Sequence, residues 1–268
     1  MKGRRIGHRH TGVDGNKRNT TGVWIVVVQK KIFVVIPAYQ AALTLESVFE
    51  RIPRELYERG VRVIVVNDGS SDATGDVAHR IAQSRANVEV IDHARNKGYA
   101  QAQKTGFSHA LAEGAEIVAL LHADGQYAPE LLPRLLAPLE KDEADVVIGS
   151  RMLERGALKG GMPLYKYIAN KALTAIENMA YGLRVSEYHS GYMLYSRRCL
   201  ETIPFVRLSD TFHFDGEMIM MAGKRKLRIK EVAIPTRYAD ERSHLKPVQY
   251  GFDVLKIVWH NYRGKYEF

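Results

Sequence analysis

Cysteine is nearly absent from this chain, and long apolar runs are missing altogether. The single cysteine, Cys199, excludes an internal disulfide and any zinc site built from several cysteines. No apolar run reaches the roughly 18–20 residues of a membrane-spanning helix. The segment GVWIVVV at 22–28 is too short and runs into QKK. We therefore expect a cytoplasmic protein of a reducing compartment that has no span of its own.

Two common nucleotide-binding motifs are also missing. No G-x-x-x-x-G-K-[ST] sequence occurs, which excludes a P-loop, and no G-x-G-x-x-G follows the first apolar run, which excludes a dehydrogenase fingerprint. A nucleotide held without either motif would need a metal ion or basic side chains for its phosphates.

The net charge of +9 lies at the two ends of the 268-residue chain. Residues 1–31 hold eight Lys and Arg against Asp14 alone, and residues 224–268 hold 11 against 5 acidic residues. The central residues 32–223 hold 20 against 24. An acidic centre without a recognition motif argues against a nucleic-acid binder. The basic ends would suit anionic lipid or a diphosphate, although a solvated tail explains them equally well.

Apolar, β-branched runs alternate with helical patterns over the first 150 residues. Continuous apolar strands that alternate with helices predict an α/β fold, with a mostly parallel sheet covered by helices on both faces. The strands are expected at 32–39, 61–70, 88–93, 116–124 and 144–150, and the helices at 42–53, 72–83, 100–114 and 129–140.

The pattern changes after residue 150. A helix is predicted at 163–183, and further strands at 191–197 and 227–235. The helix carries an apolar stripe, which would either pack on the sheet or lie at a membrane surface. No repeat and no low-complexity linker occurs. We expect a mobile basic extension at 1–30, one domain at 31–240 and a basic tail or helix at 241–268; the stripe consists of Leu164, Ile168, Ala172, Ala175, Ile176 and Met179.

Polar residues gather where the predicted strands end. Ligands of open parallel sheets bind beyond the carboxyl ends of the strands. Any one of these ends could be a plain turn or a helix cap, NDGSSD most readily, but four in register predict one ligand across the strand tips. Among them, His122, Asp124 and Gln126 could supply a metal site. The four ends are Pro37-Ala38-Tyr39, Asn67-Asp68-Gly69-Ser70, His122-Ala123-Asp124-Gly125-Gln126 and Gly149-Ser150-Arg151.

Six segments occur in the order and spacing of one enzyme family: IFVVIPAYQ, VIVVNDGSSD, NKGYAQAQKTGF, LLHADGQYAPE, VIGSR and SGYMLYSR. On these segments the chain resembles the family 2 glycosyltransferases over about residues 31–240. The resemblance is strongest to the dolichyl-phosphate mannose synthase-like branch, which includes bacterial polyprenyl-phosphate sugar transferases. It implies the Rossmann-like GT-A fold of nucleotide-diphospho-sugar transferases, and transfer that inverts the anomeric carbon.

By the same resemblance, HADGQ stands where the family has an Asp-x-Asp motif that carries Mg²⁺ or Mn²⁺ under the donor diphosphate. Asp124 takes the metal-ligand role, and Gln126 supports it. His122 replaces the usual first acidic residue. It either ligates the metal, in which case the imidazole favours Mn²⁺, or only hydrogen-bonds the nucleotide. The other implied donor contacts are Pro37, Tyr39, Val66 and Asp68 at the base and ribose, Ala123 beside the metal ligands, Arg151 at the phosphates, and Arg237, Arg242 and Lys246 as a diphosphate clamp.

The resemblance also implies an acceptor site. EYHSGYMLY at 187–195 resembles the stretch beside the acceptor, with Glu187 where Asp is commoner. Asp215 and Glu217 match a carboxylate pair that orients the acceptor or takes its proton, so these two and Arg151 are the catalytic candidates. A carboxylate favoured by the start of a helix also explains Glu217, and we interpret His189 as structural.

Three functions stay open on the sequence. The first is an inverting, metal-dependent glycosyltransferase that moves a sugar from a UDP- or GDP-linked donor to a polyprenyl phosphate, attached peripherally at the cytoplasmic face of a membrane. The second is a soluble transferase that acts on a glycan, a lipid or a small-molecule hydroxyl. The third is a non-catalytic nucleotide-sugar binder, because His122 and Ala41 depart from the family pattern. Nothing in the sequence selects the sugar, the base or the oligomeric state.

Overall fold

The computed structural model describes residues 16–18, 24–26, 29–235 and 247–268. The chain divides into two units, residues 1–30 and 31–268. In the first unit, β1 (Asn16–Arg18) pairs antiparallel with β2 (Trp24–Val26), which comes from the apolar run at 22–28. Most of the extension predicted to be mobile lies outside the described residues.

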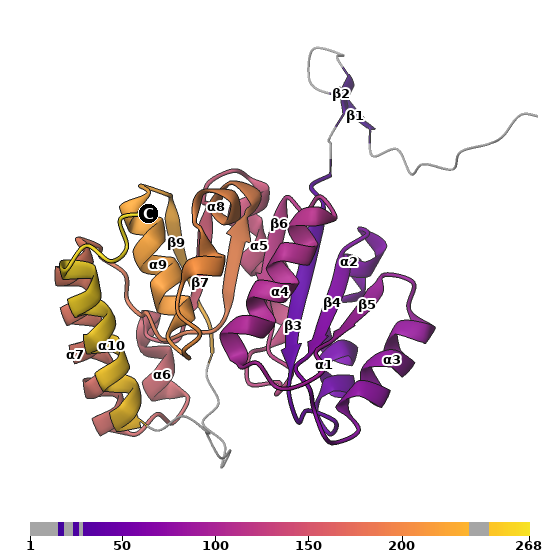
Figure 1. The fold of residues 1–268 in the computed structure, drawn as a ribbon. Coiled ribbons are helices and arrows are strands. Elements are labelled where there is room, and N and C mark those ends of the chain that lie inside the picture. The colour runs from indigo at the N-terminus through magenta and orange to yellow at the C-terminus, as the bar shows by residue number, and fades with distance from the viewer. Residues whose placement is uncertain (1–15, 19–23, 27–28, 236–246) are drawn as a thin grey trace, which may run out of the picture. The chain divides into compact units, whose positions relative to one another are not determined.

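A seven-stranded sheet forms the centre of the second unit (Figure 1). Its strands are β3 (Ile32–Ala38), β4 (Arg62–Asn67), β5 (Val88–Asp92), β6 (Ile117–Leu120), β7 (Val146–Ser150), β8 (Met193–Ser196) and β9 (Ile229–Ala233). Their order is β5-β4-β3-β6-β8-β7-β9, and only β8 runs antiparallel to its neighbours. The mostly parallel sheet and all seven of its predicted strands are confirmed.

Helices cover both faces of this sheet, as the sequence predicts. They are α1 (Leu45–Arg51), α2 (Arg54–Glu58), α3 (Thr74–Ser84), α4 (Tyr99–Ala112), α5 (Leu132–Glu140), α6 (Gly156–Lys159), α7 (Leu164–Tyr181), α8 (Arg197–Thr202), α9 (Phe214–Lys224) and α10 (Pro247–Tyr262). Short 3₁₀ turns, η1 (Pro129–Leu131), η2 (Leu153–Arg155) and η3 (Phe205–Arg207), connect some of them.

Two apolar cores lie on opposite faces of the sheet, because successive residues of a strand point to opposite sides. In β3, Val34 and Ile36 join the core that α1, α3 and α5 cover. Phe33 and Val35 join the core that α4, α8 and α9 cover. Ile257 of α10 belongs to the second core, so the compact unit includes the C-terminal helix.

Helix α7 turns its apolar stripe outward. Leu164 is 63% exposed, Ile168 58% and Met179 82%, whereas Thr174 and Glu177 on the opposite side are buried. The main packing partners of the helix are α10, α9 and α6. Of the two readings of the stripe, packing on the sheet is therefore wrong. Within the described residues, no helix is both long and apolar enough to cross a membrane.

Candidate active site

The carboxyl ends of β3, β4, β6 and β7 meet at one edge of the sheet. Parallel pairing joins β3 to β4 up to Ala38 and Asn67, and β3 to β6 up to Val35 and Leu120. Strand β8 runs antiparallel to both β6 and β7, so those two strands point the same way. The four polar strand ends therefore share one edge, as predicted.

Hydrogen bonds to its backbone carbonyls hold the loop after β6 in place, and the side chain of Asp124 in this loop is exposed to solvent. The Thr44 hydroxyl donates to the Ala123 carbonyl at 2.7 Å, and Arg51 donates to the Gly125 carbonyl at 3.3 Å. Asp124 is exposed, and its Oδ1 accepts the backbone N–H of Gln126 at 3.0 Å. An exposed carboxylate beside an exposed amide suits a hard divalent cation, so the loop fits the metal that the resemblance implies.

A hydrogen-bond chain joins this loop to helix α9. The Tyr99 hydroxyl lies 2.8 Å from Asp215 Oδ2 and 2.9 Å from His122 Nε2. A phenol has one proton to donate, so when Asp215 is ionised that proton goes to the carboxylate and the His122 Nε2–H donates to the phenol oxygen. That arrangement occupies Nε2 and leaves Nδ1 as the nitrogen that could meet a metal or a nucleotide.

Close packing holds the His122 ring in place. A Cβ atom on Gly191 would lie 2.5 Å from His122 Nε2, so only glycine fits in the SGY segment at this point. The ring of Tyr127 meets the imidazole edge-on with centroids 4.9 Å apart, and its hydroxyl accepts the Gly191 N–H at 2.8 Å. The acceptor-side segment therefore touches the metal-side histidine directly.

Burial sets the protonation states at this site. It raises the pKa of the Asp215 carboxyl to about 6, and the hydrogen bond from Tyr99 opposes the shift. Burial also lowers the pKa of the His122 imidazole, while the charge of Asp124 opposes that shift. At neutral pH, Asp215 is therefore an ionised carboxylate and His122 a neutral imidazole.

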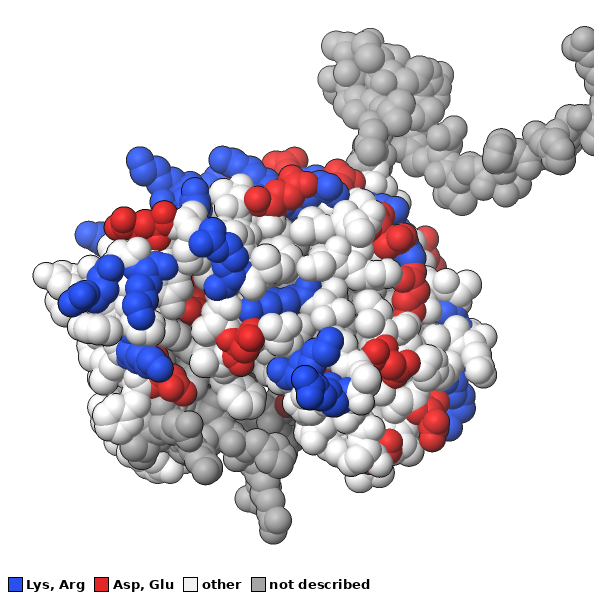
Figure 2. Space-filling view, viewed as in Figure 1, with Lys and Arg blue, Asp and Glu red and all other residues white. Residues whose placement is uncertain are grey.

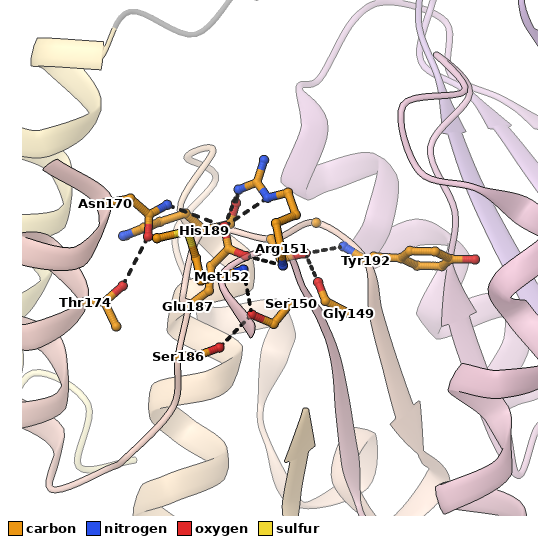
Figure 3. Close-up of polar contacts among 12 residues, drawn as sticks. Gly149, Ser150, Arg151, Met152, Asn170, Thr174, Ser186, Glu187, His189 and Tyr192 are labelled. Atoms are coloured by element: carbon orange, nitrogen blue, oxygen red, sulfur yellow. Dashed lines mark hydrogen bonds and ion pairs between the residues drawn. The ribbon is translucent and has the colours of Figure 1, made fainter. Parts of the chain in front are cut away.

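Arg151 and Glu187 form a buried ion pair (Figure 3). The backbone N–H of Arg151 donates to Glu187 Oε2 at 2.9 Å, and its Nε donates to Oε1 at 3.0 Å. Its Nη2 donates to the same carboxylate and to the His189 carbonyl at 2.7 Å. The end of β7 is thereby tied to the EYHSG segment. The Arg151 side chain is 18% exposed, and that of Glu187 is fully buried.

Asp68 organises the turn that precedes α4. Its buried carboxylate accepts hydrogen bonds from His93 Nδ1 at 2.6 Å, from the Lys97 N–H at 2.9 Å and from the Gly98 N–H at 2.8 Å. Gly98 has a φ of 96°, which glycine adopts without strain. Asp68, which follows β4, therefore fixes the turn that positions Tyr99, the residue after Gly98.

The other predicted donor residues differ in what they present at this edge. Tyr39 follows β3 with its side chain 52% exposed, so its ring is available to a base. Pro37 is half-buried within β3. Val66 and Ala123 are buried, so they would meet a ligand mainly through their backbone. Arg237, Arg242 and Lys246 lie outside the described residues.

The structure does not bring Glu217 to the hydrogen-bond chain. Residues two apart on a helix point to different sides, and Asp215 and Glu217 do so on α9. Glu217 is fully buried, and its Oε2 accepts the Ser209 N–H at 3.0 Å and the Ser209 hydroxyl at 2.5 Å. Its Oε1 accepts the Tyr266 hydroxyl. Asp215 alone of the pair faces Tyr99 and His122.

Sequence reasoning missed Tyr99 and His93 as members of the site. Tyr99 begins α4 and lies in NKGYAQAQKTGF, which served only as a family motif, whereas His93 is the last residue of the strand predicted at 88–93. A tyrosine that directly follows a glycine at the start of a helix, at the ligand-binding edge, is the signal that could have identified Tyr99. For His93 no comparable signal exists, because it meets Asp68 only through the sheet pairing of β4 with β5.

Several known proteins are similar to this chain in sequence or in fold. An N-acetylglucosaminyltransferase of Methanococcus voltae, named for UDP-N-acetylglucosamine and dolichyl phosphate, is 30% identical over 80% of this chain and 88% of its own. An undecaprenyl-phosphate mannosyltransferase of Micrococcus luteus is 29% identical over 76% and 82% of the two chains. Glucosyl-3-phosphoglycerate synthase of Mycobacterium tuberculosis, solved with Mn²⁺, UDP and phosphoglyceric acid, has a TM-score of 0.64 at 20% identity, over 87% of this chain and 78% of its own.

The structural similarity confirms the GT-A fold, and the sequence similarity extends through the site. The family model described as "Glycosyl transferase family 2" matches residues 33–203, a span that runs from β3 through the metal-side loop, Arg151 and the SGY segment. The chain therefore belongs to glycosyl transferase family 2 and is a glycosyltransferase.

Proposed function

We propose that this glycosyltransferase moves a sugar, with inversion, from a nucleotide-diphospho-sugar to a polyprenyl phosphate at a membrane surface. The relatives named above carry lipid phosphates in their names, which supports the acceptor class. The observation that carries the proposal is the chain His122–Tyr99–Asp215. It connects the loop that offers a metal site to the helix that offers a base.

A divalent cation would be held by Asp124, with Gln126 and His122 Nδ1 in support. The imidazole favours Mn²⁺ over Mg²⁺. When bound, the ion stabilises the charge that develops on the leaving nucleoside diphosphate. Tyr39 would contact the base, and Arg151, oriented by Glu187, would contact a phosphate. Arg237, Arg242 and Lys246 would complete the diphosphate clamp.

Asp215 would serve the acceptor. In an inverting transfer, an acceptor oxygen forms its bond to the anomeric carbon on the face opposite the leaving diphosphate oxygen, whose bond breaks. The proton of a monoanionic phosphate, or of a hydroxyl, passes to a base. An ionised Asp215 with a pKa of about 6 is matched to a phosphate monoester, whose second pKa is also about 6. Glu217, held by Ser209 and Tyr266, would keep α9 in place.

An apolar surface on α7 and α10 supports a membrane-borne acceptor. The two helices pack side by side at one end of the unit (Figure 1). Large exposed apolar patches on soluble domains mark sites of interaction with proteins or membranes. We call this surface the apolar face; it consists of Leu164, Tyr165, Ile168 and Met179 of α7 and Phe252, Leu255, Trp259 and Tyr262 of α10.

Basic side chains accompany the apolar face. Figure 2 shows more Lys and Arg than Asp and Glu on the half of the molecule that contains α9 and α10. Each Lys or Arg near an anionic surface contributes about 1 kcal/mol, and aromatic side chains suit the headgroup region. We therefore propose an anionic bilayer as the occupant of the apolar face; the exposed basic residues on these helices and at the C-terminus are Lys166, Lys171, Lys256, Arg263 and Lys265.

The test is a matrix of donors and acceptors with the purified full chain. UDP- and GDP-sugars are combined with polyprenyl phosphate, with soluble phosphate esters and with soluble sugar hydroxyls, in the presence of Mn²⁺ or Mg²⁺. We expect release of nucleoside diphosphate together with a labelled lipid product. Efficient transfer to a soluble acceptor and none to the lipid would overturn the proposed acceptor. Donor binding without any release would indicate a binding protein.

A further inference from the structure

We propose that Glu177, His189 and His213 form a second metal site, buried and separate from the loop of Asp124, that takes a transition-metal ion such as Zn²⁺. This inference goes beyond the proposed function, because it does not depend on which sugar or acceptor is used. The three residues come from α7, from the segment before β8 and from the position just before α9.

The positions of the three side chains suit one ion. His213 Nε2 lies 3.0 Å from Glu177 Oε1, and His189 Nε2 lies 3.3 Å from Glu177 Oε2. One ligand atom from each residue lies within 4.8 Å of the other two. Tetrahedral ligands about 2.0–2.1 Å from a Zn²⁺ ion are about 3.3 Å apart. The two observed separations, which involve different oxygens of Glu177, are close to this value.

The facing atoms have only one another as partners. Both oxygens of Glu177 and the Nε2 atoms of His189 and His213 are buried, and apart from these two carboxylate–imidazole contacts none has a hydrogen-bond partner among the described residues. The side chains of Glu177 and His213 are fully buried, and that of His189 is 8% exposed. Buried polar atoms in native proteins are nearly always paired. A buried carboxylate and two imidazole nitrogens that have only one another as partners are a donor set that suits a cation.

Tyr250 on α10 contacts the Nδ1 atoms of both histidines, the ring nitrogens that do not face Glu177. Its hydroxyl oxygen lies 2.9 Å from His189 Nδ1 and 2.9 Å from His213 Nδ1. A phenol oxygen has two lone pairs and can accept both Nδ1–H groups, which places both Nε2 lone pairs toward Glu177. Outer hydrogen bonds of this kind fix the tautomer of metal-binding histidines.

Without a metal, the same ring of contacts is one proton short. If Tyr250 donates to one Nδ1 and accepts from the other, one imidazole can donate its Nε2–H to Glu177, but the other presents a lone pair to the carboxylate. A metal cation removes that repulsion, as one added proton would. Two neutral imidazole nitrogens and one carboxylate oxygen suit Zn²⁺ and similar first-row ions, whereas Mg²⁺ and Ca²⁺ prefer oxygen ligands.

The ion would join segments that build the acceptor side of the active site. His213 lies two residues before Asp215, and the His189 carbonyl accepts a hydrogen bond from Arg151 at 2.7 Å. Glu177 and Tyr250 belong to α7 and α10, which carry the apolar face. The burial of the site favours a structural role, in which the metal fastens these helices to the sheet.

The test is the metal content of tag-free full-length protein. Wild type and Asp124→Asn are refolded with Zn²⁺ or with EDTA, dialysed, and analysed for zinc per chain. The Asp124→Asn variant removes the donor-side ligand, and a His8→Ala/His10→Ala variant controls for zinc on the N-terminal histidines. We expect one retained zinc per chain in all three proteins, and a higher Tm for zinc-refolded than for EDTA-refolded protein.

Glu177→Gln keeps the size of the side chain and removes the charge. We expect this variant and His189→Asn to lose the bound zinc, the Tm response and the visible spectrum of the Co²⁺-loaded protein, whereas the exposed-site control His79→Gln keeps them. If wild type and Asp124→Asn retain no zinc, or if folded Glu177→Gln and His189→Asn retain as much as wild type, the site does not exist. Zinc content of the wild type decides the matter even if a variant fails to fold.

Discussion

The Tyr99 hydroxyl donates a hydrogen bond of 2.8 Å to Asp215, a residue 116 positions further along the chain. The contact joins the start of α4 to the start of α9, on the side of His122. Through Tyr99 and His122, a change in the protonation of Asp215 can reach the loop that carries Asp124. Its consequences can be measured in activity, in pH dependence and in stability.

Replacement of Asp215 by Asn should remove the base without removing the side chain. We expect kcat to fall by at least about 10²-fold, a typical loss for a general base. In the wild type, kcat should rise with pH through a midpoint near 6, because Asp215 must be ionised. The variant should lack that midpoint. A wild-type profile that is flat between pH 5 and 8 would contradict this role.

Replacement of Tyr99 by Phe should shift the midpoint of the kcat–pH profile without abolishing it. The Tyr99 hydroxyl stabilises the ionised carboxylate, so its loss raises the pKa of Asp215. A hydrogen bond to a charged group contributes about 1.5 kcal/mol, which corresponds to about one pH unit. The kcat profile of the variant should therefore be displaced upward by about that amount. Tyr165→Phe, on the exposed part of α7, serves as the matched control and should leave the profile unchanged.

The same carboxyl should make stability depend on pH. The pKa of Asp215 is raised from 3.8 to about 6, so the folded state binds this proton more tightly than the unfolded state. The favourable contribution is fully present below about pH 4 and is lost as pH rises through 6, by about 3 kcal/mol in total. Denaturant unfolding of wild type and Asp215→Asn at pH 4 and pH 8 measures this. At pH 8 the variant should be more stable than the wild type. Equal stabilities at pH 8 would contradict the raised pKa of Asp215.

Asp124→Ala should impair metal-dependent donor binding and leave the fold intact. The side chain is exposed, and its carboxylate accepts a hydrogen bond from the nearby Gln126 N–H. Calorimetry with the nucleotide sugar, with and without Mn²⁺, should show a lost metal dependence, while the Tm changes little. Equal affinities in wild type and variant under both conditions would exclude Asp124 as the metal ligand.

The apolar face should mediate binding to anionic vesicles. Trp259→Asp and Phe252→Asp place a charge on the exposed side of α10 and should each reduce co-sedimentation about tenfold or more, with wild-type binding released by high salt. Val206→Asp alters an exposed apolar residue of η3 and is the control. If Trp259→Asp and Phe252→Asp both bind like the wild type, lipid does not occupy the apolar face.

The sheet was predictable because its strands are apolar on both faces and bounded by turn residues. The site at the strand ends followed from topology, since parallel strands deliver their last residues to one edge. Glu217 illustrates what did not follow: its separation from Asp215 depends on how α9 is rotated against Ser209 and Tyr266. The apolar stripe of α7 is a second example. A helix normally buries such a stripe, but α7 buries its polar side, where Glu177 meets two histidines and Asn178 bonds the backbone of Val185.

Strand β8 gives the active site a further property. Because it runs against its neighbours, its beginning lies where the other strands end. The segment that carries Glu187, His189 and Gly191 therefore enters the site from outside the set of loops that follow β3, β4 and β6. This segment contacts His122 through Gly191 and Arg151 through Glu187, so it meets two of the strand-end loops without belonging to either of them. A change in its sequence would therefore be felt at the ends of both β6 and β7, although neither of those loops had changed.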